Sequence, residues 1–348
     1  MACFSPTSIW LFRYEMGPLQ WFRSCFLTHY RKNLLKTNRS QNNHRPIKIM
    51  SSSRFRLMPT PDDPALTAEL KGLDASGNEI AIPVVRESPL TIYLNRQEIV
   101  TAMTLGDQPQ ALAVGFLRNQ NMLLADDEIT AIDYDADLSV VVVRTARTTN
   151  YEKKLQKKVR TSGCAQGTIY GDIMDEFDKI TLTSSLKVKA SELYALSAAI
   201  NTIPSLYLKA GAIHGCALSQ GAEPLIYVED IGRHNAVDKI AGHLFLHNLS
   251  AADKIFYTTG RLTTEMVLKT VLMGAPILVS RSGFTEAGVA LAQQAGLTLI
   301  GRMRGSRFTV LSGAERIIFD DIKQAVADDK ALSSQSSSAQ ANKLGGKR

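Results

Sequence analysis

The chain has 348 residues and 45% hydrophobic content, which is enough for one large or two ordinary domains with buried cores. No apolar run approaches the ~20 residues that cross a bilayer, so the sequence predicts no membrane-spanning segment. The net charge of +7 lies entirely in residues 1–50, because the remainder carries 32 basic and 32 acidic residues. A neutral remainder gives no indication of nucleic-acid binding.

The four cysteines are Cys3, Cys25, Cys164 and Cys216. Two lie within residues 1–50, the other two are far apart, and no Cys-x-x-Cys pair occurs. This spacing excludes a disulfide scaffold and a zinc ribbon. It suits a reducing cytosol with one reactive thiol at most, so we predict a cytoplasmic protein.

Residues 1–53 are expected to be a doubtful or disordered N-terminal extension. They mix aromatic and basic residues, then turn polar, and Met50 with the serines after it resembles an ordinary N-terminus. We favour a mis-assigned upstream start, in which case residues 1–50 are dispensable. An organelle transit peptide is the alternative, since such peptides are basic and poor in acids. A secretory signal is disfavoured, because no compact apolar segment ends in a small-residue cleavage site.

Residues 80–150 are predicted to form a strand-rich N-terminal part, preceded by a loose, proline-containing lead-in at 54–75. Period-two alternation indicates strands, and apolar residues at helical spacing indicate a helix. The expected elements are strands over 81–94 with a turn at Asn95-Arg96, a helix over 111–117, and paired strands over 129–134 and 138–144.

Residues 151–180 are predicted to be a mobile linker, and residues 181–322 a layered α/β domain in which short strands alternate with helices. Residues 331–348 are rich in Ser, Gln, Ala, Gly and Lys, which predicts a disordered tail. The expected elements of the domain are helices over 186–203 and from about 235, 263 and 285, and strands over 211–219, 225–228, 254–258, 277–280, 298–300 and 308–310.

Cys164 is the candidate catalytic residue. It lies in a glycine-containing segment, 161–168, that follows four lysines and an arginine. Flanking glycines expose the residue between them, and nearby positive charge lowers the pKa of a thiol. An exposed thiolate can accept sulfur from a donor persulfide and pass it on. The competing interpretation is a structural cysteine, since cysteine is among the most buried residue types.

The segment Val228–Lys239 predicts a ligand site. An apolar strand ends in two carboxylates, the second being Asp230, and a glycine turn leads into a helix that starts with Arg233 and contains Asn235. Strand ends that open onto helix N-termini are where α/β sheets bind ligands. The competing interpretation is a helix cap with a surface ion pair.

Four segments carry motifs in the same order as in a known family: Arg86–Asn95, Gly211–Leu218, Glu229–Lys239 and Thr259–Lys269. Through them the chain resembles, over residues 80–320, the formate dehydrogenase accessory sulfurtransferases, the FdhD family. The resemblance implies a sulfurtransferase that takes sulfur from a cysteine desulfurase as a persulfide. The sulfur then passes to the molybdenum cofactor, bis-molybdopterin guanine dinucleotide, before that cofactor enters formate dehydrogenase. It also implies a cytidine deaminase-like fold without zinc, and a homodimer.

The chain departs from this family in the Cys164 loop. Relatives commonly place two cysteines as Cys-x-x-Cys, whereas Gly167 occupies the second position here. Cys164 therefore acts alone in this interpretation, which puts a resolving disulfide in doubt. A persulfide relay needs only one thiol.

A late basic segment, Ile300–Phe308, contains three arginines in six residues. Arginine forks bind pyrophosphate and stack on guanine, and the resemblance associates this segment with the guanine dinucleotide. Arg302 stands where relatives often have an aromatic residue, and an ordinary basic turn is the competing interpretation. The preceding loop, 280–283, is expected near the ligand, with Thr285 as a helix N-cap. The predicted cofactor-binding residues are Arg302, Met303, Arg304, Gly305, Ser306 and Arg307, with Asp230, Arg233 and Asn235.

Two rival functions stay open. His214 and Cys216 invite a zinc-deaminase interpretation, but the other ligands of such a site are missing, so we predict no metal and a core position for Cys216. The other rival is a cofactor-binding chaperone that moves no sulfur. Sulfur loading on Cys164 would distinguish a sulfurtransferase from such a chaperone. We expect neither a nucleic-acid nor a membrane partner.

Overall fold

The computed structural model describes residues 55–147, 158–159, 169–170, 174 and 177–320. Residues 1–50 and residues 51–348 form two separate units, and every described residue belongs to the second. Cys164, most of the predicted linker and both predicted terminal extensions therefore lie outside the described residues.

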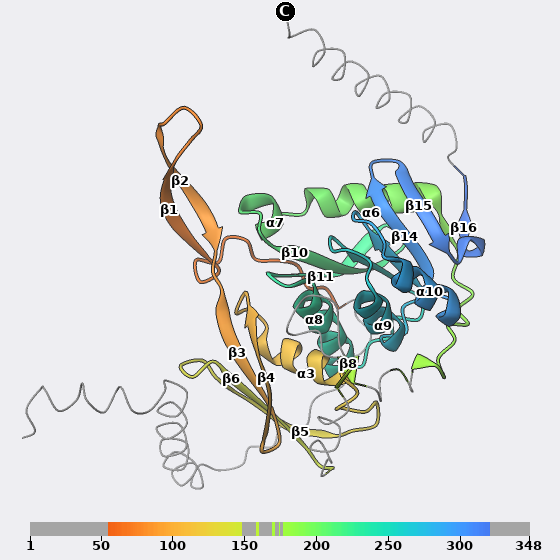
Figure 1. Ribbon diagram of the computed structural model, residues 1–348, viewed down its shortest axis with the longest axis horizontal. Coiled ribbons are helices and arrows are strands. Elements are labelled where there is room, and N and C mark those ends of the chain that lie inside the picture. The colour runs from red at the N-terminus through yellow and green to blue at the C-terminus, as the bar shows by residue number, and fades with distance from the viewer. Residues whose placement is uncertain (1–54, 148–157, 160–168, 171–173, 175–176, 321–348) are drawn as a thin grey trace, which may run out of the picture. The chain divides into compact units, whose positions relative to one another are not determined.

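A six-stranded sheet forms the centre of the α/β domain (Figure 1). The three middle strands are parallel to one another, and the outer ones pair antiparallel. The middle strands Ile255–Thr258 and Ile277–Ser280 are buried at every residue, as expected where a parallel sheet is covered on both faces. In spatial order the strands are β11 (Glu223–Asp230), β10 (His214–Gln220), β12 (Ile255–Thr258), β13 (Ile277–Ser280), β14 (Thr298–Arg304) and β15 (Arg307–Ser312).

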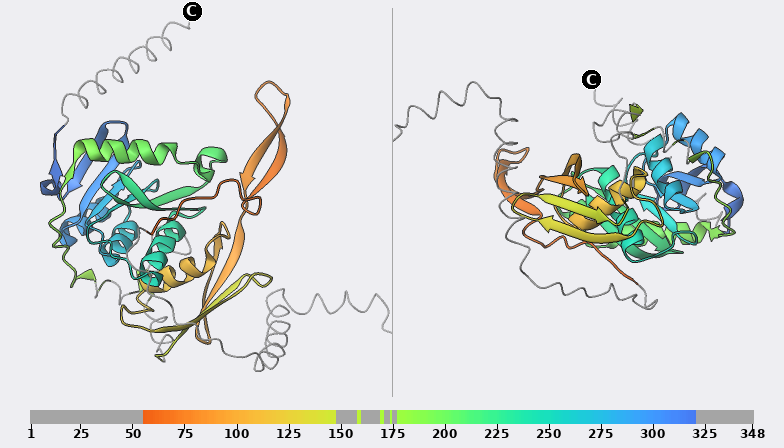
Figure 2. Two further views of the ribbon diagram at one scale, coloured as in Figure 1. Left: turned by 180° about the vertical axis from the view of Figure 1, so that it is seen from behind. Right: turned by 90° about the horizontal axis from the view of Figure 1, so that it is seen from below.

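Helices cover both faces of this sheet. Alternate strand residues such as Val228 and Phe256 pack with α8 (Arg233–Leu246), α9 (Thr264–Leu272) and α10 (Glu286–Ala295). Their neighbours, such as Tyr227 and Tyr257, pack with α6 (Ala190–Thr202) on the opposite face. Figure 2 shows the sheet and its helices from two further sides. The smaller elements beside them are α7 (Leu206–Lys209), the 3₁₀ turn η2 (Ala314–Arg316), and the paired strands β9 (Val188–Lys189) and β16 (Ile317–Ile318).

A second, four-stranded sheet lies in the N-terminal part, and α3 (Pro109–Asn119) joins it to the α/β domain by packing on α8. Glycines allow the backbones of α3 and α8 to approach closely. A Cβ on Gly115 would lie 1.7 Å from the Asp238 carbonyl oxygen, and one on Gly242 would lie 1.9 Å from that of Ala111. The strands, in spatial order, are β4 (Gln97–Thr104), β3 (Ser88–Leu94), β6 (Val140–Thr145) and β5 (Ile129–Asp135).

The loose lead-in predicted at 54–75 is wrong in part. Leu57 forms a parallel bridge with Ile226 at the β11 edge of the large sheet, and β1 (Thr67–Leu73) pairs with β2 (Glu79–Val85) in a hairpin. The sequence of β1 alternates as a strand does, but the nearby prolines led to the prediction of an irregular segment.

The other predicted elements are confirmed, with several shifts of boundary. The strand predicted over 211–219 begins only at His214. The helix predicted over 186–203 begins only at Ala190, because β9 occupies its first residues. The strand predicted over 298–300 continues to Arg304, and its neighbour begins at Arg307. Two short strands, β7 (Lys158–Val159) and β8 (Ile169–Tyr170), pair within the predicted linker. Within the described part of the chain, none of the helices has both the length and the apolar character needed to cross a membrane.

Candidate functional site

The candidate site lies along one edge of the large sheet. The parallel strands β12, β13 and β14 all end there, and β10 begins there. Asp230, the last residue of β11, pairs with His214 at the start of β10. This carboxyl edge is the position where ligands enter open α/β sheets.

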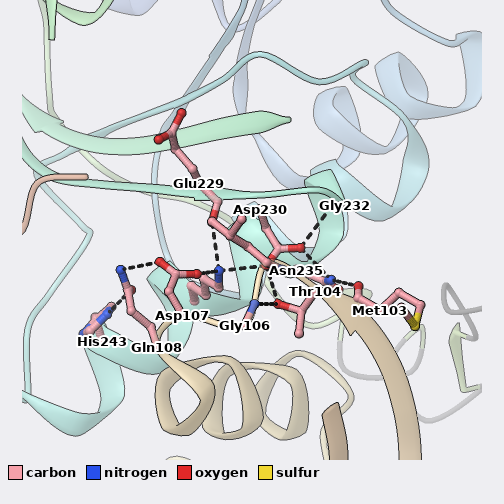
Figure 3. A network of polar contacts seen from close by, with 12 residues as sticks. Met103, Thr104, Gly106, Asp107, Gln108, Glu229, Asp230, Gly232, Asn235 and His243 are labelled. Atoms are coloured by element: carbon pink, nitrogen blue, oxygen red, sulfur yellow. Dashed lines mark hydrogen bonds and ion pairs between the residues drawn. The ribbon is translucent and has the colours of Figure 1, made fainter. Parts of the chain in front are cut away.

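Asp230 is completely buried at this edge and forms the centre of a polar network (Figure 3). Its Oδ2 accepts a 2.6 Å hydrogen bond from the Thr104 hydroxyl and lies 2.7 Å from Lys239 Nζ. Its Oδ1 accepts from the Gly232 amide at 3.1 Å and from Asn235 Nδ2 at 2.8 Å. The carboxylate thus fixes the turn from β11 into α8 and ties it to the end of β4.

Lys239 supplies the positive charge of this network. Its ammonium group is fully buried, forms an ion pair with Asp107, and donates to the Glu229 carbonyl oxygen at 2.8 Å. Burial opposes the charged form, but the carboxylates of Asp230 and Asp107 outweigh it, and the pKa of Lys239 lies above its ordinary value. The lysine therefore stays charged inside the protein.

A second buried cluster lies deeper between the helices. Lys269 Nζ on α9 lies 2.7 Å from the Asp238 carboxylate on α8, and Asn119 Nδ2 on α3 donates to the same carboxylate at 2.6 Å. Asp238 and Lys269 both belong to motifs that carry the family resemblance. The structure gives them a role in joining three helices, and both residues are buried.

The first turn of α8 and the start of β10 bring further ionisable groups to the edge. His234 Nε2 lies 2.7 Å from Glu265 Oε2, and His214 Nδ1 lies 3.2 Å from the Thr259 hydroxyl. Burial lowers the pKa of His214, and the positive charge of Arg233 lowers it further. Neutral histidines and a buried arginine thus occupy the middle of the carboxyl edge.

A cavity of about 600 Å³ opens at the β13–β14 end of the edge. We name it the arginine pocket, because four of its lining residues are arginines. Its lining residues are Arg281, Ser282, Gly283, Arg302, Arg304, Arg307, Phe308 and Thr309.

A backbone irregularity shapes the arginine pocket. Arg302 has a positive φ of 56°, a conformation that residues other than glycine adopt rarely. The pairing of β14 with β15 shifts register between Gly301 and Arg304, and the Arg302 amide donates to the Ser282 carbonyl oxygen at 2.8 Å. Bulges and strained residues of this kind re-aim side chains at functional sites.

The structure brings together some of the predicted cofactor-binding residues and separates others. Arg302, Arg304 and Arg307 line the arginine pocket, and Gly305-Ser306 forms the turn between their strands. Met303 is 1% exposed and packs in the core on the α6 face. The residues Asp230, Arg233 and Asn235 are not among those that line the pocket.

Sequence reasoning missed two residues of the buried network, Thr104 and Asp107. Arg281 was expected near the ligand as part of the loop at 280–283, and the structure places it in the pocket wall. The predicted N-cap is confirmed, since the Thr285 hydroxyl accepts from the Gly288 amide at 3.2 Å.

Cys216 is a core residue, as the sequence predicted. It is fully buried, its Sγ donates to the Thr258 hydroxyl at 3.4 Å, and burial raises the pKa of its thiol to about 12. A thiol of this kind is protonated and inert at neutral pH. Among the described residues no group of three or more His, Cys, Asp or Glu is arranged to hold a metal ion. The expectation of a metal-free protein stays a prediction.

His243 on α8 should make the stability of the protein depend on pH. Its Nε2 lies 2.8 Å from Gln108 Oε1, and burial lowers its pKa from 6.5 to about 4. Folding therefore disfavours protonation, so the free energy of unfolding should fall as the pH drops from about 6.5 to about 4 and level off below. We expect His243→Gln, which cannot titrate, to remove on the order of 2 kcal/mol of that fall.

Urea unfolding of both proteins at pH 7 and pH 4.5 checks this expectation. Part of the pH dependence should persist in the variant, because the pKa values of His214 and His234 are also lowered by burial. An identical pH dependence in the two proteins would contradict a buried, neutral His243.

Comparison with known proteins identifies the family that the chain matches. The model of the FdhD/NarQ family matches residues 85–318. A Bacillus subtilis protein named sulfur carrier protein FdhD is 31% identical over 235 residues, covering 67% of this chain and 90% of the relative. A Listeria innocua protein of the same name is 31% identical over 242 residues, covering 69% and 93%.

A solved structure agrees with these sequence relatives. It is a crystal structure described as that of a formate dehydrogenase accessory protein from Desulfotalea psychrophila. It superposes with a TM-score of 0.61 at 28% identity, and the match covers 73% of this chain and all of that one.

Proposed function

Because this chain belongs to the FdhD/NarQ family, we propose that it is a sulfur carrier that serves formate dehydrogenase. Its curated relatives bear the name sulfur carrier protein, and the matched structure is described as a formate dehydrogenase accessory protein. In detail, Cys164 accepts sulfur from a cysteine desulfurase as a persulfide. The sulfur then passes to the molybdenum cofactor, bis-molybdopterin guanine dinucleotide.

The arginine pocket is the observation that carries this proposal. A guanine dinucleotide presents a pyrophosphate and a flat base. Guanidinium groups bind phosphate oxygens in pairs, and they also stack on aromatic planes. Arg281, Arg302, Arg304 and Arg307 surround one cavity at the carboxyl edge. The charge of residues 51–348 is balanced, so four arginines around one cavity are a local concentration of positive charge that favours an anionic ligand.

The buried network lies at the same carboxyl edge of the sheet as the pocket. Asp230 and Asn235 are engaged with Thr104 and the Met103 carbonyl oxygen. In our proposal these two residues hold the β11–α8 turn in place, and direct contact with the cofactor by Asp230, Arg233 and Asn235 stays a prediction.

Two finer features belong to the same proposal. The sheet combines an antiparallel pair, β11–β10, with three parallel strands, an order that supports a cytidine deaminase-like domain. We also expect a homodimer, since a bis-guanine dinucleotide cofactor carries two nucleotides and two chains would supply two arginine pockets.

Substitution of a pocket arginine tests the proposal. Arg304→Ala should weaken GDP binding about tenfold to a hundredfold, because it removes one charge-assisted contact worth roughly 1.5–3 kcal/mol. Isothermal titration calorimetry measures the affinity. Sulfur loading by a cysteine desulfurase should be unchanged in this variant, since Cys164 is retained.

Arg96→Ala is a matched control, because Arg96 is an exposed arginine in the β3–β4 turn. It should bind GDP as the wild type does. Equal GDP affinity in the wild type, Arg304→Ala and Arg307→Ala would show that the nucleotide binds elsewhere.

A further inference from the structure

Arg281 reaches the arginine pocket from a different strand than its three neighbours. Arg302, Arg304 and Arg307 come from the β14–β15 hairpin, whereas Arg281 follows β13. A long arginine side chain beside three like charges is repelled by them, and it has about 2 kcal/mol of rotamer entropy to lose when fixed. Its position in the pocket wall therefore depends on contacts outside the pocket.

Two such contacts hold Arg281. Its Nη1 donates a 3.1 Å hydrogen bond to Asn201 Oδ1 at the end of α6. Its guanidinium carbon lies 5.5 Å from the centre of the Tyr207 ring, within the range of a cation–π interaction. Asn201 belongs to α6 and Tyr207 to α7, and neither residue lines the pocket. The position of Arg281 in the pocket wall therefore depends on a segment outside the pocket.

Tyr207 lies in α7, a single turn of helix that cannot be stable by itself. Its N-cap, Ser205, provides no side-chain cap hydrogen bond. The Glu229 carboxylate takes that role instead, accepting 2.8 Å hydrogen bonds from the Leu206 and Tyr207 amides. A carboxylate at a helix N-terminus satisfies free amides and interacts favourably with the helix dipole.

Glu229 is well suited to hold this turn. It is 3% exposed on β11, and its backbone carbonyl oxygen accepts from Lys239. The rigid strand and the buried lysine thus fix the carboxylate that anchors α7.

We propose that Glu229 and Tyr207 are positioning residues for the anionic ligand of the arginine pocket. Glu229 fixes α7, α7 places Tyr207, and Tyr207 together with Asn201 holds Arg281 toward the ligand phosphates. This inference rests on the proposed function, because it assumes that a nucleoside diphosphate group occupies the pocket. It adds Arg281 as the fourth phosphate ligand and names the residues that keep it in place.

GDP binding by calorimetry tests the inference in a double-substitution series. Arg281→Ala should weaken GDP binding about tenfold or more. Tyr207→Leu should weaken it about threefold to tenfold, the range of a cation–π contact. Tyr207→Phe retains the ring and should restore affinity close to that of the wild type.

The two effects should not add. In an Arg281→Ala background, Tyr207→Leu should cause no further loss, because the side chain that it positions is already gone. A purely structural role for Tyr207 would weaken binding equally in both backgrounds and would overturn the inference. Leu208→Ala, an exposed position on the same helix turn, is the matched control and should leave affinity unchanged.

Glu229→Gln extends the test, since an amide offers only one oxygen to two backbone donors. It should weaken GDP binding about as much as Tyr207→Leu, and less in the Arg281→Ala background than alone. If Glu229→Gln does not fold, the Tyr207 series decides by itself.

Failure of the inference differs from failure of the proposed function. Unchanged affinity in both Arg304→Ala and Arg281→Ala would mean that GDP binds outside the arginine pocket, and both proposals would fall. A loss in Arg304→Ala with none in Arg281→Ala or Tyr207→Leu would overturn only the positioning role.

Discussion

Lys239→Met should lower the free energy of unfolding by roughly 3–5 kcal/mol, the usual cost of breaking a buried ion pair from one side. Methionine fills much of the same space, so the loss reports the missing charge more than a cavity. Without the ammonium group, Asp230 stays buried with a negative charge and Asp107 loses its ion-pair partner in the network. Urea unfolding followed by circular dichroism measures the change.

Two further variants test whether the loss of stability comes from the broken ion pairs of the network or from substitution in general. Adding Asp230→Asn to Lys239→Met removes the uncompensated charge and should recover part of the lost stability. Arg144→Met breaks an exposed ion pair with Asp133 and should cost within about 1 kcal/mol. A Lys239→Met protein that unfolds at the same urea concentration as the wild type would show that the network contributes no net stability.

The β11–α8 motif shows what sequence could and could not predict about this site. The strand, its two terminal carboxylates and the helix start are where the local pattern predicted them. The partners of Asp230 and Asn235 were not predictable, because Thr104 and Met103 lie 126 and 132 residues away along the chain. Periodicity reports which face of an element is buried, and it carries no information about which distant segment covers it.

The arginine pocket was predicted in part for a similar reason. The density of arginines after residue 300 is a local signal, whereas Arg281 joins them only because β13 and β14 are neighbours in the sheet. The inclusion of Met303 followed from ending the predicted strand at residue 300. In a strand that continues to Arg304, side chains alternate between faces, so Met303 points into the core when Arg302 and Arg304 are exposed.

The last prediction concerns the sulfur itself. Incubation with a cysteine desulfurase and cysteine should add one sulfur atom to the wild-type protein and none to Cys164→Ala, as read by intact-mass analysis. The Cys164 thiolate attacks the outer sulfur of the donor persulfide, and the donor leaves as a thiolate. No external oxidant is required, and no second cysteine takes part. Cys164→Ser should also stay unloaded, because its hydroxyl is not ionised at neutral pH and cannot carry persulfide sulfur.

Cys216→Ala is the control that gives this experiment its meaning. With a pKa of about 12, roughly one Cys216 thiol in 10⁵ is ionised at pH 7, and its complete burial denies access to a donor enzyme. Cys216→Ala should therefore load like the wild type. Loading that survives in Cys164→Ala and disappears in Cys216→Ala would show that Cys216, and not Cys164, carries the sulfur. If the wild type accepts no sulfur but still binds GDP, the protein holds the cofactor without moving sulfur, and the chaperone alternative is correct.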